Sequence, residues 1–170
     1  MTVFGRATLM TGLVTIVAAQ VIAAQTPAVR LVELTGNDLM KYSVTAIAAK
    51  PGSSTARLRE LLMTVHFMNK ERFVGDSKLH EMVAIAMEED WKVCDAHLEL
   101  LVTIVGKVVA EGMASGEFKA ADPMTAALCV FSAMVRFFHP QIIAQCATKP
   151  GPTLEQMVDF VIGSISATKA

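Results

Sequence analysis

The segment from residue 91 to residue 113 constrains the fold more than any other part of the chain. Its main polar positions recur every four residues, and most of the other positions are aliphatic. A helix with one narrow polar strip is buried on most of its sides, so other apolar elements must pack around it. The positions of the strip are Asp95, Glu99, Thr103, Lys107 and Glu111.

The composition indicates a folded domain with more apolar surface than one small soluble domain usually buries. Hydrophobic residues make up 53% and charged residues 18% of the 170 positions, which excludes a disordered chain. A chain of this length forms one domain, or one domain with a tail. A partner subunit, a ligand cavity or a membrane must cover the surplus apolar surface. The net charge of -1 does not indicate a nucleic-acid-binding protein.

Cap residues divide the chain after residue 52 into helices. Residues 53–55 (Ser-Ser-Thr) offer N-caps for a first helix, and Gly116 ends the helix that contains residues 91–113. Asp122 followed by Pro123 begins the next helix, because proline is favoured at the first helical position. No strand pattern is evident, so the sequence predicts an all-α fold.

The C-terminal third is predicted to hold two apolar helices. The first continues to Phe138, where His139 and Pro140 interrupt it. The second begins with a capping box, Thr153 to Gln156, and carries no charge between residues 159 and 169. Two neighbouring helices of this kind predict a helical partner.

Residues 1–50 differ from residues 51–170, and we predict a division into two parts there. Pro27 and Gly36 interrupt the first part, which is poorly periodic. Residues 7–24 are nearly unbroken apolar sequence that follows Arg6, the layout of a signal peptide. As a membrane span this stretch is marginal, because it is short and contains polar groups. An exported or membrane-tethered helical protein therefore stays open as an alternative.

Five segments between residues 53 and 168 form an ordered series. They are residues 69–73 (NKERF), 79–83 (LHEMV), 109–123 (VAEGMASGEFKAADP), 135–140 (VRFFHP) and 153–165. This series resembles the effector-binding domain of tetracycline-repressor-type (TetR family) regulators. The resemblance implies an antiparallel helical bundle, a homodimer joined by the last two long helices of each subunit, and a small-molecule pocket among the middle helices.

We expect the DNA-binding half of such a regulator to be missing or degraded here. Residues 43–50 resemble the opening of its second DNA-binding helix, and residues 53–58 imitate a recognition helix. However, Pro51 and Gly52 interrupt this pattern, the expected aromatic and lysine-containing ending is absent, and no room is left for a connecting helix. Residues 1–50 carry four basic and two acidic residues, and residues 51–170 carry eleven and fourteen. Neither part is basic enough to indicate extensive phosphate contacts.

Reactive and metal-binding patterns are not evident in the sequence. Cys94 and His97 are spaced as two ligands could be, but no His-x3-His or Glu-x-x-His repeat supports them. There is no glycine-rich phosphate loop and no nucleophile elbow. We therefore predict no metal, no cofactor and no enzymatic activity. Three cysteines without a CxxC pair fit a reducing, cytoplasmic compartment.

The eleven methionines suit an adaptable apolar pocket, because methionine is flexible and polarizable. We predict that a small apolar or amphipathic effector binds in a pocket lined by Val65, Met68, Trp91, Cys94, His97, Leu98, Phe131 and Met134.

The predicted dimer interface lies on the last helices. It contains Leu128, Val135, Phe138, Met157, Phe160, Val161 and Ser164. The chain is thus interpreted as a ligand-sensing, dimerising regulatory domain that does not bind DNA by itself. A complete repressor with a divergent helix-turn-helix in residues 15–60 is the alternative.

Overall fold

The computed structural model describes residues 38–74, 85 and 92–167, and these residues form helices joined by connections. Contacts divide the chain into Met1–Gly36 and Asn37–Ala170, so every described residue belongs to the second unit. The predicted all-α fold is confirmed. No helix in the described ranges is long and apolar enough to cross a membrane. The apolar stretch of residues 7–24 lies outside these ranges.

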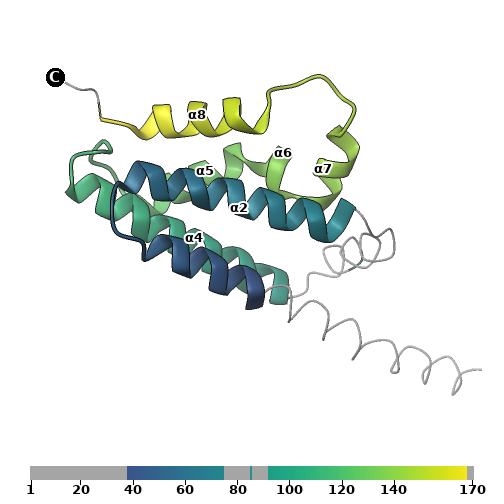
Figure 1. The fold of residues 1–170 in the computed structure, drawn as a ribbon, viewed down its shortest axis with the longest axis horizontal. Helices are drawn as coiled ribbons and strands as arrows, with labels where there is room; N and C mark the ends of the chain where they lie inside the picture. The colour runs from purple at the N-terminus through teal and green to yellow at the C-terminus, as the bar shows by residue number, and fades with distance from the viewer. Residues whose placement is uncertain (1–37, 75–84, 86–91, 168–170) are drawn as a thin grey trace, which may run out of the picture. The chain divides into compact units, whose positions relative to one another are not determined.

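Seven helical segments build the described domain (Figure 1). The first covers residues 38–48 and is called helix 38–48. The others are α2 (Ser54–Val74), α4 (Lys92–Ala114), α5 (Pro123–Ala133), α6 (Val135–Phe138), α7 (Pro140–Cys146) and α8 (Leu154–Ile165).

Helix α2 is the centre of the domain and packs against α4, α6, α7 and α8. Its buried positions follow the helical spacing that the sequence predicts. The C-terminal half of α4 is buried against α2 and α5, whereas Leu98 near its beginning is exposed. The core side chains of α2 and α4 include Leu58, Leu61, Leu62, Val65, Leu101, Val102, Val105, Val108 and Val109.

Helix 38–48 belongs to this core, which differs from the prediction for residues 43–50. From the sequence, that stretch resembles the opening of the second helix of a degraded DNA-binding part, with no room left for a connecting helix after it. In the structure, Met40, Val44 and Ile47 lie on one face of helix 38–48 and are buried with the residues of α2. Their spacing of four and three residues gives the helix one apolar face.

The predicted helix to Phe138 is interrupted once more than the sequence indicates. It breaks at Met134, whose side chain is fully buried, and continues as α6. The predicted interruption at His139 and Pro140 is confirmed. Because α6 ends there, its last carbonyl groups need partners from outside the helix. Helix α2 supplies them from His66 and Asn69.

These two bonds connect α2 directly to α6. His66 Nδ1 lies 2.8 Å from the Phe137 carbonyl oxygen, which can only accept, so Nδ1 donates. Asn69 Nδ2 donates to the Phe138 carbonyl oxygen at 2.9 Å. The His66 ring also meets the Phe137 ring edge to face, with centroids 5.8 Å apart. Helices α2 and α6 are therefore held together by directional contacts as well as by apolar packing.

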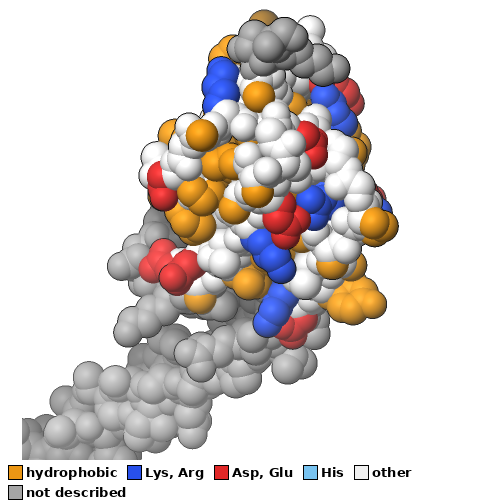
Figure 2. All heavy atoms as spheres, turned by 90° about the vertical axis from the view of Figure 1, so that its left-hand side faces the viewer, with side chains coloured by type: hydrophobic (Ala, Val, Ile, Leu, Met, Phe, Trp, Pro, Cys, Tyr) orange, Lys and Arg blue, Asp and Glu red, His pale blue; other side chains and the backbone are white. Residues whose placement is uncertain are grey.

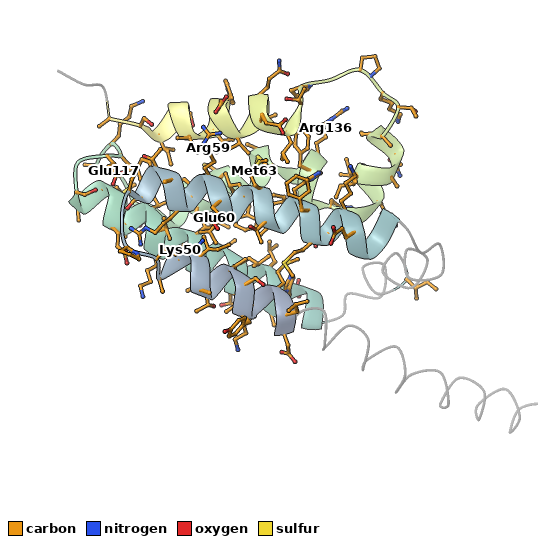
Figure 3. All side chains as sticks on the ribbon, in the orientation of Figure 1. Lys50, Arg59, Glu60, Met63, Glu117 and Arg136 are labelled. Atoms are coloured by element: carbon orange, nitrogen blue, oxygen red, sulfur yellow. The ribbon has the colours of Figure 1, made fainter. Side chains whose placement is uncertain are left out.

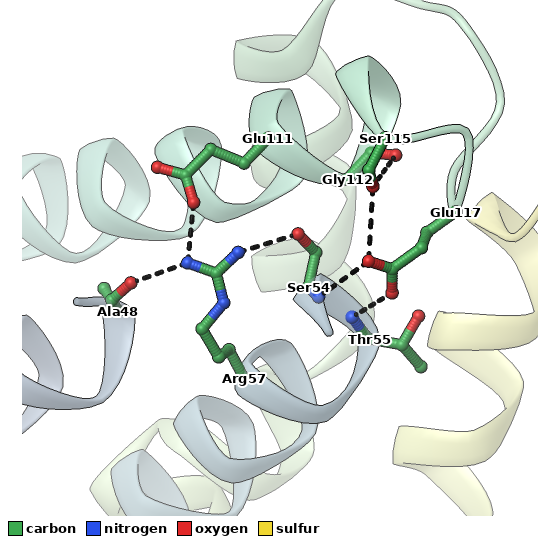
Figure 4. A network of polar contacts seen from close by, with 8 residues as sticks. All are labelled: Ala48, Ser54, Thr55, Arg57, Glu111, Gly112, Ser115 and Glu117. Atoms are coloured by element: carbon green, nitrogen blue, oxygen red, sulfur yellow. Dashed lines mark hydrogen bonds and ion pairs between the residues drawn. The ribbon is translucent and has the colours of Figure 1, made fainter. Parts of the chain in front are cut away.

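Glu117 caps the N-terminus of α2 from a distant part of the chain (Figures 3 and 4). Gly116 has φ +77°, and this left-handed conformation, which favours glycine, turns the chain after α4. The Glu117 carboxylate accepts from Ser53 Oγ at 2.6 Å and from the N–H groups of Ser54 and Thr55 at 2.9 Å each. A carboxylate is favoured at this position because the N-terminal N–H groups of a helix are unpaired and carry partial positive charge.

The same turn also binds the end of α8. The Lys119 N–H donates to the Ile165 carbonyl at 2.9 Å, and the Ala167 N–H donates to the Glu117 carbonyl at 2.9 Å. Phe118 covers Gly112 so closely that a Cβ there would lie 2.2 Å from the ring. The joint after α4 therefore fixes the ends of α2, α4 and α8 relative to one another.

The lowered pKa of Glu117 shows that the hydrogen bonds of the cap stabilise the charged carboxylate. Partial burial acts to raise the pKa of this carboxyl. The hydrogen bonds from Ser53 and from the N–H groups of Thr55 and Ser54 outweigh burial and lower the pKa to about 2. In the unfolded chain the pKa of a glutamate is about 4.3. The cap therefore stabilises the fold fully above that value and is lost as the pH falls toward 2.

We predict that Glu117→Gln removes this pH-dependent part of the stability. At pH 7 the variant should unfold with a free energy lower by about 1–2 kcal/mol, the size of a helix cap. The difference from the wild type should shrink as the pH falls from 5 toward 2, because the wild-type carboxylate is then neutralised. Urea unfolding at several pH values measures it, with Glu99→Gln as an exposed charge control. A difference that stays constant across this pH range would contradict the assignment.

Candidate dimerisation and effector-binding sites

The outward face of α5 and the beginning of α6 is free of charge. No charged residue occurs between Asp122 and Arg136. Met124, Leu128 and Val135 are 42%, 52% and 44% exposed. Met124 and Leu128 are four residues apart and so lie on the same face of α5. An exposed apolar strip of this kind is typical of a surface that another protein covers.

The cap at the beginning of α5 places this strip. The Asp122 side chain accepts from the Thr125 N–H at 2.6 Å, and Pro123 occupies the first turn, which confirms the predicted helix start. Hydrogen bonds from the Thr125 hydroxyl and N–H lower the pKa of the Asp122 carboxyl. The charged carboxylate therefore marks the boundary of the uncharged face and holds the first turn of α5.

Helix α8 adds a second exposed strip. Its inward face carries Leu154, Val158, Val161 and Ile162, whereas Phe160 on the outward face is 69% exposed. A Cβ added to Gly163 would meet nothing within 4 Å, so the surface one turn after Phe160 is flat and open. Since α5 and α8 contact each other, the two strips lie on neighbouring helices.

The predicted interface residues fall into two groups. Leu128, Val135, Phe160 and Ser164 are exposed and Met157 is partly buried, whereas Phe138 and Val161 lie in the core. The buried pair is on the inward face because these apolar side chains complete the packing around α2. Met124 and Gly163 lie on the same exposed faces but are not among the predicted interface residues. Met124 could have been included, since it precedes Leu128 by one helical turn.

The predicted pocket residues are likewise divided. Val65, Phe131 and Met134 are buried in one core cluster, and Met68 packs against that cluster. Leu98 is half exposed and His97 partly buried, so neither belongs to the cluster. The side chains of Trp91 and Cys94 lie outside the described ones. The structure thus brings together residues of α2, α5 and the α5–α6 junction, and the pocket stays a prediction.

The sequence did not predict the polar contacts of the joint after α4. Glu117 is in a segment that the sequence analysis singled out, but its pairing with Ser53, Ser54 and Thr55 spans more than sixty positions. No local pattern signals a bond over that separation. Across the described side chains, no group of three His, Cys, Asp or Glu residues is placed to hold a metal ion.

Positively and negatively charged side chains lie side by side on the surface near the joint. Figure 2 faces the end of the domain at which α2 begins, and it shows Lys and Arg side chains beside Asp and Glu, with hydrophobic patches between them. Two exposed ion pairs are examples of this pairing: Lys50–Glu60, whose residues are labelled in Figure 3, and Arg59–Asp159. Such pairs each contribute about 0–1 kcal/mol, so the surface is balanced rather than strongly stabilised by charge.

Comparison with known families agrees with this architecture. Residues 54–158 match the family described as tetracyclin repressor-like, C-terminal domain. The matched range begins with the first residue of α2 and ends within α8, so it covers the core residues Val65, Phe131 and Met134 and the uncharged face of α5. Among curated proteins, none matches the chain. The chain therefore belongs to the tetracycline repressor-like C-terminal domain family.

Proposed function

We propose that this chain is the ligand-sensing and dimerising regulatory domain of a TetR-like regulator, and that it does not bind DNA by itself. Membership of the family supports a regulatory rather than an enzymatic role. The observation that carries the proposal is the uncharged, exposed strip on α5 and the beginning of α6, together with the exposed Phe160 on the neighbouring α8. Large apolar side chains exposed in a row mark a binding surface on a soluble protein.

A second copy of the chain is the partner that this surface fits. A twofold dimer brings the same patch of both subunits together, so the patch must be complementary to itself. An uncharged face meets this condition without placing like charges opposite each other. Phe160 offers a large protruding side chain, and Gly163 leaves open space one turn away. Four helices, α5 and α8 of each subunit, would form the bundle.

The effector would bind at the apolar cluster around Val65, Met68 and Met134. Flexible methionine side chains can rearrange around a small apolar or amphipathic molecule. Helix α2 contributes the first two residues, and it is also the helix that binds the carbonyl groups of α6 through His66 and Asn69. A ligand that displaces α2 would therefore shift α6, which carries Val135 of the dimer surface. The mechanism is a shift between two helix arrangements.

DNA binding by this chain is disfavoured by the way α2 begins. Residues 53–58 imitate a recognition helix in the sequence, but from Ser54 onward they are the beginning of a 21-residue helix. Glu117 caps the first turn of this helix, and Leu58 is fully buried. The mixed charges near this end give no basic surface for phosphates in the view of Figure 2. We place the protein in the cytoplasm, where the free thiols of Cys129 and Cys146 would persist.

Charge introduced into the uncharged face should separate the subunits. We expect the wild type to be a dimer at micromolar concentration, and Leu128→Glu to raise its dissociation constant by about 100-fold or more. Burial of one large apolar side chain contributes about 1.5–3 kcal/mol, and each substitution occurs twice in a symmetric interface. Leu98→Glu is the matched control, since Leu98 is equally exposed on α4.

Sedimentation velocity with light scattering measures the outcome. A wild type that remains a monomer at this concentration would refute the dimer. Equal dissociation in Leu128→Glu and Leu98→Glu would show that the contact lies elsewhere. Circular dichroism of each variant establishes that it is folded.

The pocket can be tested with an apolar fluorescent probe, anilinonaphthalene sulfonate. We expect the wild type to bind it saturably, and Met68→Ala to weaken this binding at least several-fold. Met113→Ala is the control, because Met113 is also partly buried against the core. Met113 lies at the C-terminal end of α4, next to the joint and outside the predicted pocket. The two variants lose the same side-chain volume, so their stabilities should fall by similar amounts. Equal probe affinity in both variants would contradict the location of the pocket.

A further inference from the structure

Arg57 of α2 makes polar contacts with helix 38–48, with α4 and with the first turn of its own helix (Figure 4). Its Nη1 donates to the Ala48 carbonyl oxygen at 2.8 Å and to Glu111 Oε2 at 2.6 Å. Its Nη2 donates to Ser54 Oγ at 2.9 Å. These contacts join the end of helix 38–48 to the beginning of α2 and to the last turns of α4.

The Arg57 side chain is only 11% exposed, so its charge needs partners. Glu111, which is 42% exposed, supplies the opposite charge. The Ala48 carbonyl is one of the unpaired groups at the C-terminal end of helix 38–48, where a cation is favoured. Arg57 therefore acts as a C-terminal cap for a helix to which it does not belong.

The chain between the two helices contains Gly52, which packs against no other part of the domain. Gly52 has φ +114°, a conformation that other residues rarely adopt, and a Cβ there would meet nothing within 4 Å. The last helical hydrogen bonds before it are those of the Ala49 and Lys50 N–H groups. Two kinds of contact hold helix 38–48 in place: the apolar face that includes Met40, and the directional bond to Arg57.

The Arg57 contacts also reach the joint after α4. Ser54 accepts from Arg57 through its hydroxyl and donates to Glu117 through its N–H, so one buried residue belongs to both networks. Arg57 Nε is buried and has no hydrogen-bond partner among the described residues. An unpaired buried donor costs free energy. The unpaired Nε therefore offsets part of the free energy that the three hydrogen bonds of Arg57 contribute to holding helix 38–48 in place.

We propose that Arg57 is a latch that fixes helix 38–48 on α2 and α4, and that opening the latch lets this helix pivot about Gly52 while the rest of the domain stays folded. The latch thus sets how firmly helix 38–48 is held to α4 and to the joint. The latch does not depend on a ligand or on dimerisation.

Hydrogen–deuterium exchange of the full 170-residue chain tests the latch. In Arg57→Met and in Glu111→Gln we expect amides of residues 42–50 to exchange about tenfold faster or more, with those of α5 and α8 unchanged. Arg59→Met is the matched control, because it removes an arginine of the same helix that forms only an exposed pair with Asp159.

Two results would overturn the proposal. One is unchanged exchange of residues 42–50 in both latch variants. The other is a uniform increase across α2, α4, α5 and α8, which would make Arg57 an ordinary stabilising contact. If Arg57→Met fails to fold, Glu111→Gln decides, because it keeps the side-chain shape and removes only the charge that pairs with Arg57.

Discussion

The Glu117 carboxylate at the N-terminus of α2 is the contact on which the arrangement of the other elements depends. It satisfies unpaired N–H groups of a helix that packs against four other helices. The turn that carries it is bonded through its backbone to the end of α8. One charged group therefore sets where α2 begins relative to α4 and to α8. The apolar core alone would leave this alignment loosely specified, because apolar contacts have no preferred direction.

Helix α2 connects the parts of the domain to which we assign a function. Its first turn is held by Glu117 and contains the buried Ser54, which also binds Arg57. Its middle contributes Val65 to the core cluster, and its later turns bind the carbonyl groups of α6 through His66 and Asn69. A displacement of α2 would thus move helix 38–48, the joint and the proposed dimer surface. This connection is the physical basis of the sensing role that we propose.

The sequence predicted the features that depend on neighbouring residues. The cap of Asp122 on Thr125 and the capping box of Thr153 with Gln156 are confirmed, because each bond spans three positions. The break before Pro140 is confirmed for the same reason, since a proline acts on the turn that contains it. The break at Met134 was missed, because a fully buried methionine has no local signal for a change of helix direction.

The candidate surfaces were predicted only in part. Leu128 and Phe160 are exposed as an interface requires, but Phe138 belongs to the core and Leu98 lies outside the predicted pocket cluster. Periodicity identifies the apolar positions of a helix. It does not say which of them face inward when a helix has more than one apolar side. For α5, apolar on both sides, only its packing against α4 and α8 decides that question.

By itself, the sequence determined the all-helical class, most of the helix boundaries after residue 52 and the resemblance to a regulator domain. These follow from residue spacing, caps and prolines, which act within a few positions. Only the tertiary structure decided that helix 38–48 joins the core, that Glu117 caps α2 and that Arg57 ties three helices together. Each of these depends on contacts between residues far apart in the chain. Their partners come close only because packing of the apolar faces brings the helix ends to one place.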